Sequence, residues 1–431
     1  MNPCHYACGT EGHLLGRRAF FDRCFRVGAG ATLAGLGQFA MPAMADRMVR
    51  DQKRMLVIRM AGGLSQLESW DPKPGTATGG PFRAIPTSVP GLRISELLPR
   101  TARIMHHLAV LRGLNTAMDD HAKGHYLMMT GRRQTPAQLY PEIGAVVAKA
   151  TDSADRTLPG HVVITPGGGG GRNADSAYLG PKYASVVLGN GNPPQYTSRP
   201  GNLSGAVECS QDAFRRRLND RFALRRRTAE TEAWAQSFEQ AQALMEQKEA
   251  FDLSLEPDSD HERYGRTDFG RHCLLARRLV EKGISFVQVT HSNYDTHNEN
   301  FNFHLEQLGE FDGPFATLIQ DLADRGLLKH TLVVVLSEFG RTPSINRLYG
   351  RDHWGKAWSV CLGGAGIKAG FVHGATNRDG TEVTEGMVDG GHLFHTYLEA
   401  LGVKSGGSFM VNGQKMPMAD PSCGPIESVL A

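Results

Sequence analysis

The sequence predicts an α/β protein built on a doubly wound, mostly parallel sheet with helices on both faces. Three observations support this fold class. Short apolar runs rich in β-branched residues recur along the chain, and helical patterns lie between them. The 51 glycines among 431 residues suit the many tight turns between strands and helices. Alternating strands and helices form parallel strands that crossover helices connect.

Five segments are predicted as central strands, because they are apolar on both faces, as strands covered on both sides must be. In chain order they are Met55–Met60, Val162–Ile164, Ser285–Val289, Thr331–Leu336 and Trp358–Leu362. Helices are predicted before two of these strands. One has apolar residues at i, i+3, i+4 and i+7 over Phe315–Leu322, and the other is closed by Gly283.

Residues near 205–250 interrupt this alternation with a long polar helical stretch, which we interpret as a helical insertion. It carries two arginine clusters, Arg215–Arg217 and Arg225–Arg227. A solvated helix face explains them better than an anionic partner does. The whole chain has Lys+Arg 47 against Asp+Glu 44, a net charge of +3. This balance argues against a nucleic-acid partner.

The N-terminus has the order of a removable export signal. Arg17-Arg18 precedes two aromatic residues, a weakly apolar Gly/Ala-rich run covers Val27–Ala40, and Ala43-Met44-Ala45 offers small residues for cleavage. We therefore expect a twin-arginine signal over 1–45, a single α/β domain over 46–431 and a periplasmic or otherwise exported protein. The apolar run is too short for a membrane span, so we expect no transmembrane segment.

Polar residues gather where the predicted strands end, which is the edge where open α/β sheets bind their ligands. Taken singly, each polar residue is also explained as part of a turn, as a helix cap or as a hydrogen-bonded core histidine. Taken together, Asp295, His297, Glu338 and His353 are expected to converge with His121 on one crevice. At least three of these side-chain tips should lie within about 4–5 Å of one another. In the alternative geometry, Glu338 turns away to bond Arg341 and only the histidines are close.

Histidine and carboxylate residues without a CxxC pair suit zinc, manganese or iron better than calcium. We predict a divalent metal ion, zinc or manganese, with Asp295, His297, Glu338 and His353 as its ligands. His121, which opens a predicted helix, is a candidate nucleophile, general acid/base or ligand. His125 and Arg341 complete the predicted catalytic set.

Several motifs carry a family resemblance. They are Gly62-Gly63-Leu64-Ser65-Gln66, Trp70-Asp71-Pro72-Lys73-Pro74, Asp120-His121-Ala122-Lys123-Gly124, Thr130-Gly131-Arg132-Arg133, Asp295-Thr296-His297, Ser337-Glu338-Phe339-Gly340-Arg341-Thr342-Pro343 and Arg351-Asp352-His353-Trp354. With them the chain is similar, over Met55–Gly402, to domain-of-unknown-function family 1501, a twin-arginine-exported branch of the alkaline phosphatase/sulfatase superfamily. The resemblance implies an alkaline phosphatase/sulfatase-like fold.

The chain departs from characterised sulfatases and phosphatases at the positions that carry their chemistry. The resemblance places His121 where those enzymes have a Cys, Ser or Thr nucleophile, and His125 where sulfatases have an arginine. Ala61 and Gly62 stand where the first strand would end in Asp. Without the Cys or Ser, the formylglycine mechanism of sulfatases is excluded. His353 matches a phosphatase ligand directly, and Asp295 matches one approximately.

Two functions follow. In the first, the protein is a metal-dependent hydrolase of phosphate or sulfate esters with an atypical site, acting on a small-molecule or glycan ester. In the second, it is a degenerate, non-catalytic member that binds an anionic glycan or a partner protein. The polar residues that gather at the strand ends favour the first function. The absence of the ligands that characterised sulfatases and phosphatases carry favours the second. The sequence leaves the oligomeric state open.

The signal prediction has a direct test. N-terminal sequencing of the mature protein should begin near Asp46, because the segment before it has the composition of a removable signal. A mature protein that begins at Met1 would contradict the prediction.

Overall fold

The fold is organised around one large sheet, seen in a computed structural model that describes residues 52–152, 158–167, 174–193, 205–223, 229–411 and 413–431. The predicted signal, 1–45, lies outside the described residues. Residues 50–431 form one compact unit. Across the sheet, the eight strands are β12 (Phe371–His373), β4 (Leu108–Leu114), β11 (Trp358–Gly364), β8 (Thr331–Leu336), β1 (Arg54–Met60), β7 (Phe286–His291), β5 (His161–Thr165) and β6 (Val186–Gly189).

The sheet is mostly parallel, as predicted. Strand β11 is antiparallel to both β4 and β8, and every other pair of neighbours is parallel. The five predicted strands correspond to β1, β5, β7, β8 and β11. Each is rich in apolar residues because helices cover both of its faces.

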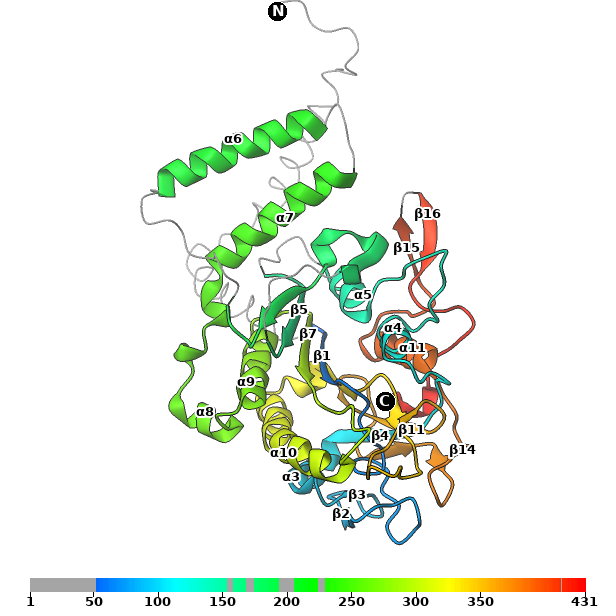
Figure 1. The fold of residues 1–431 in the computed structure, drawn as a ribbon. Coiled ribbons are helices and arrows are strands. Elements are labelled where there is room, and N and C mark those ends of the chain that lie inside the picture. The colour runs from blue at the N-terminus through cyan, green and yellow to red at the C-terminus, as the bar shows by residue number, and fades with distance from the viewer. Residues whose placement is uncertain (1–51, 153–157, 168–173, 194–204, 224–228, 412) are drawn as a thin grey trace, which may run out of the picture. The chain divides into compact units, whose positions relative to one another are not determined.

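Side chains of β1 alternate between two hydrophobic cores. Leu56 and Ile58 pack into the first core, and Met55 and Val57 pack into the second. The first core is covered by α3 (Pro99–Ile104), α8 (Asp258–Tyr264), α9 (Asp268–Glu281) and α10 (Asn300–Asp324). The second is covered by α4 (His121–Thr130), α5 (Ile143–Ala150) and α11 (Gly390–Ala400). Figure 1 shows these two helical layers, which confirm the doubly wound arrangement.

Two long helices occupy the region of the predicted insertion, α6 (Gly205–Ala223) and α7 (Ala229–Glu246). Helix α7 contacts the short helix η3 (Pro181–Tyr183), and its buried Leu244 joins the first core. Among the described residues, no helix is long and apolar enough to cross a membrane.

Smaller elements complete the unit. Four two-stranded ribbons pair β2 (Ala84–Pro86) with β3 (Arg93–Ser95), β9 (Gly340–Arg341) with β10 (His353–Trp354), β13 (Ala375–Thr376) with β14 (Val383–Glu385), and β15 (Ser408–Val411) with β16 (Gln414–Pro417). The other short helices are η1 (Met105–His107), η2 (Ala174–Leu179), η4 (Lys248–Phe251), η5 (Leu253–Leu255), η6 (Leu328–His330) and η7 (Glu427–Val429). The ribbon β9–β10 matters most here, because it carries two of the predicted site residues, Arg341 and His353.

Candidate metal centre

The candidate site lies at the carboxyl edge of the sheet. Asp295 and His297 follow β7, and Glu338 follows β8. His353 differs from the expectation that every ligand follows a strand, because it precedes β11. Since β11 is antiparallel to its neighbours, its first residues lie at the same edge. His121 opens α4, where Asp120 caps the helix by accepting from the backbone N–H of Lys123 at 3.0 Å.

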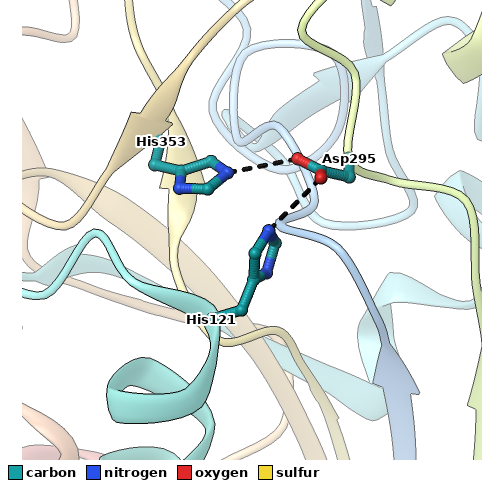
Figure 2. Close-up of side chains that lie close together, drawn as sticks. All are labelled: His121, Asp295 and His353. Atoms are coloured by element: carbon teal, nitrogen blue, oxygen red, sulfur yellow. Dashed lines mark hydrogen bonds and ion pairs between the residues drawn. The ribbon is translucent and has the colours of Figure 1, made fainter.

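Asp295 is the centre of the cluster. Its Oδ1 lies 3.1 Å from Nε2 of His353 and 3.1 Å from Nε2 of His297, and its Oδ2 lies 3.3 Å from Nε2 of His121. Figure 2 shows His121 and His353 approaching the carboxylate from different elements. Ligand atoms of His121, Asp295 and His353 all lie within 4.8 Å of one another. The predicted convergence of at least three side-chain tips is therefore present.

Two of the imidazoles are held through their Nδ1 atoms. Nδ1 of His353 donates to the carbonyl oxygen of Asp119 at 2.7 Å, and Nδ1 of His297 lies 2.7 Å from Oδ1 of Asp352. In the neutral tautomer this leaves each Nε2 with a lone pair. The two Nε2 atoms are 3.0 Å apart and both face Oδ1 of Asp295. Three acceptors that face one another this closely need a shared cation or proton, and this donor set suits a divalent metal ion.

Glu338 is paired with His121. Its Oε1 lies 2.9 Å from Nδ1 of His121 and accepts from the backbone N–H of Gly62 at 2.9 Å. The side chain of Glu338 is 3% exposed. Burial alone would raise the pKa of this carboxyl, but the charge of Arg59 and the hydrogen bond from His121 lower the pKa overall. Glu338 is therefore ionised and serves as the hydrogen-bond partner of His121, outside the triangle formed by the other three predicted ligands.

Arg341 is fully buried and bonds Asp295, not Glu338. Its guanidinium donates to Oδ1 of Asp295 at 2.6 Å, to the carbonyl of Gly63 at 2.9 Å and to the carbonyl of Arg351 at 3.0 Å. Burial opposes ionisation of Asp295, but Arg341 and the neighbouring histidines outweigh it and lower the pKa of Asp295 to about 2. Burial also lowers the pKa of Arg341 itself. The alternative geometry, with Glu338 bonded to Arg341, is absent from this site.

His125 lies one helical turn beyond His121 on α4 and outside the Asp295 cluster. Its Nε2 is 3.6 Å from Oε1 of Glu142, and its side chain lines a separate cavity. Sequence reasoning missed Asp352, although this residue stands directly before His353 in a recognised motif. It also missed Arg59, an arginine inside the otherwise apolar run of β1.

The sequence pattern of the family "Protein of unknown function (DUF1501)" matches residues 52–430. No curated protein sequence matches the chain.

Similar solved structures include the lipoteichoic acid synthase LtaP from Listeria monocytogenes, at 9% identity and a TM-score of 0.37, covering 88% of this chain and 80% of that chain. Alkaline phosphatase from the Antarctic bacterium TAB5 has 11% identity and a TM-score of 0.36, covering 81% and 99%. The PsFucS1 sulfatase from Pseudoalteromonas sp. has 13% identity and a TM-score of 0.38, covering 90% and 74%.

Gly62 gives a steric test of the site. Its φ is +118°, and an added Cβ would lie 2.5 Å from the backbone nitrogen of Asp295. Gly62→Ala should displace the Asp295 loop and weaken binding of Zn²⁺ or Mn²⁺ at least tenfold, measured by titration of metal-free protein. The control is Gly326→Ala, at φ +67° with open space around the added Cβ. It should lose about 1–2 kcal/mol of stability and keep its metal affinity. Equal metal affinities in the two variants would contradict the assigned role of this close approach.

Proposed function

This chain belongs to the family Protein of unknown function (DUF1501), and we propose that it is an exported, metal-dependent hydrolase of phosphate or sulfate esters. One observation carries the proposal. Nε2 of His297, Nε2 of His353 and Oδ1 of Asp295 lie 3.0–3.1 Å apart with their acceptor positions toward one another. These side chains are accessible at the surface, Asp295 being 48% exposed, so a substrate can reach them.

Two imidazoles and one carboxylate suit zinc or manganese. When bound, such an ion would polarise the ester and lower the pKa of a bound water. The protein contributes the orientation of the ligands. Asp352 and the carbonyl of Asp119 fix the ring positions of His297 and His353, and Arg341 holds the carboxylate of Asp295.

His121 is the proposed general acid/base. Its Nδ1–H donates to the ionised Glu338, which fixes the tautomer and the orientation of the ring. Its Nε2 is directed toward Asp295, and its side chain is 40% exposed. This atom can therefore accept a proton from water or donate one to a departing alcohol. The Glu338 contact orients the ring as in an acid/base pair, which favours this role over that of a nucleophile.

Metal content and ester hydrolysis test the proposed function together. We expect about one Zn²⁺ or Mn²⁺ per chain in protein purified from the exported fraction, and hydrolysis of p-nitrophenyl phosphate or sulfate that a chelator abolishes. Asp295→Asn should lose the metal. Asp352→Asn should weaken metal affinity about 10–100-fold, because it removes the partner that orients His297. Asp379→Asn, at an exposed carboxylate, is the control.

Two outcomes decide between the functions. Protein that holds no metal and hydrolyses no ester contradicts the hydrolase proposal and favours a non-catalytic binding protein. Metal binding that Asp295→Asn leaves intact contradicts the ligand assignment.

His121→Ala separates catalysis from stability. We expect a loss of activity of about 10²–10⁴-fold, the usual contribution of an acid/base residue, with a nearly unchanged melting temperature. The control is His106→Ala, at an exposed histidine of η1. A large loss of stability with activity retained would show that His121 is a structural residue.

A further inference from the structure

A second feature of this edge is a cavity of 530 Å³ beside the metal centre. Its floor is the sheet face that carries the second hydrophobic core. Its walls include residues of α4 and of the segment that follows α4. The volume is within the range of small-molecule sites. The lining residues are polar for the most part, in a place where the same sheet face is otherwise apolar.

The sheet register shows how the floor is built. Arg59 of β1 is the direct neighbour of Thr290 of β7. Gln288 lies two residues earlier on β7 and therefore on the same face. Two residues before Gln288 on β7, the same face carries Phe286, which pairs with Met55 of β1, and both residues belong to the second core. The second core therefore ends in a polar patch at the cavity.

The polar floor has hydrogen-bonding capacity that the described residues do not use. Gln288 and Thr290 are only 6% and 7% exposed, and the single bond between them is a long one of 3.4 Å. No hydrogen bond or ion pair joins the side chain of Arg59 to another described residue, although its charge acts on Glu338. Because all three side chains line the cavity, their donors and acceptors are available to a ligand there.

The rest of the lining is suited to hydroxyl groups. Glu142 supplies a carboxylate acceptor, Asp175 supplies a second one that also accepts from the backbone N–H of Ser185, and Tyr126 and Tyr140 supply aromatic rings. Glu142 approaches His125 at 3.6 Å. Carboxylates accept hydrogen bonds from hydroxyls and repel a negative charge. A ligand that fits this wall is therefore neutral and hydroxyl-rich on that side.

The cavity and the candidate metal centre lie close together. His125 lines the cavity and lies one helical turn from His121. Arg59 also lines it, and its charge acts on Glu338, the partner of His121. A substrate bound at both places would need to span only about one helical turn, roughly 5–6 Å.

We propose that this cavity binds the alcohol part of the ester, a hydroxyl-rich group the size of a single sugar, while Arg59 pairs with the negative charge of the ester group. The inference rests on the proposed function for the bond that is broken, but the binding site can be tested without hydrolysis. The substrate class is thus a phosphate or sulfate ester of a sugar or similar polyol.

Calorimetric titration with glucose 6-phosphate, glucose 6-sulfate, glucose and inorganic phosphate tests the cavity. The two hexose esters should bind at least tenfold more tightly than glucose or inorganic phosphate. Arg59→Gln should weaken the esters about ten- to hundredfold and leave glucose unchanged, because one charge-assisted hydrogen bond is lost. Glu142→Gln should weaken glucose and both esters by a similar factor. Arg83→Gln, at an exposed arginine, should change neither, and metal content should stay constant in all variants.

Arg59→Lys keeps the charge and provides a second variant if Arg59→Gln fails to fold; it should retain part of the preference for esters. Inorganic phosphate that binds as tightly as the hexose esters, or equal effects of Arg59→Gln and Arg83→Gln, would overturn the inference. Hexose esters that bind but are not hydrolysed would support the cavity and contradict the proposed function. Hydrolysis of an aryl ester without any binding of hexose esters would overturn the cavity assignment alone.

Discussion

The buried guanidinium of Arg341 is the interaction on which the site depends. It ties together segments that are far apart in the sequence. It donates to Gly63 after β1, to Asp295 after β7 and to the carbonyl of Arg351 before β10. A buried cation is costly unless it is paired and hydrogen-bonded, and these partners meet that requirement. Arg341 therefore acts as a positioning residue, which holds Asp295 as an ionised carboxylate at a defined point.

The sheet supplies the rest of the geometry. Strands β1, β7 and β8 run in the same direction and end at one edge, so their following loops meet there. Antiparallel β11 starts at that edge and brings His353 to the loops that follow the other strands. The close approach at Gly62, where a side chain would collide with Asp295, allows the loop after β1 to pack against the loop after β7. The same edge carries the polar floor of the cavity, so the candidate metal centre and the cavity proposed for an organic group lie close together.

Much of this could be predicted from the sequence. The continuous apolar runs predicted the central strands, and the polar motifs after them predicted which residues converge. Pairings within the cluster could not be predicted, because they depend on side-chain direction. Glu338 bonds His121 and Arg341 bonds Asp295, although Arg341 is only three residues from Glu338. The polar floor was missed because Arg59 lies within an apolar strand, where sequence pattern alone gives no sign of a cavity.

Anomalous scattering from crystals grown with Zn²⁺ or Mn²⁺ tests most directly whether Asp295, His297 and His353 bind a metal ion. We expect one strong peak at roughly 2.0–2.2 Å from Nε2 of His297, Nε2 of His353 and a carboxylate oxygen of Asp295. Nδ1 of both histidines should still be bonded to Asp352 and to the carbonyl of Asp119. No peak at this position at saturating metal concentration, with the two Nε2 atoms bonded only to water or to each other, would contradict it.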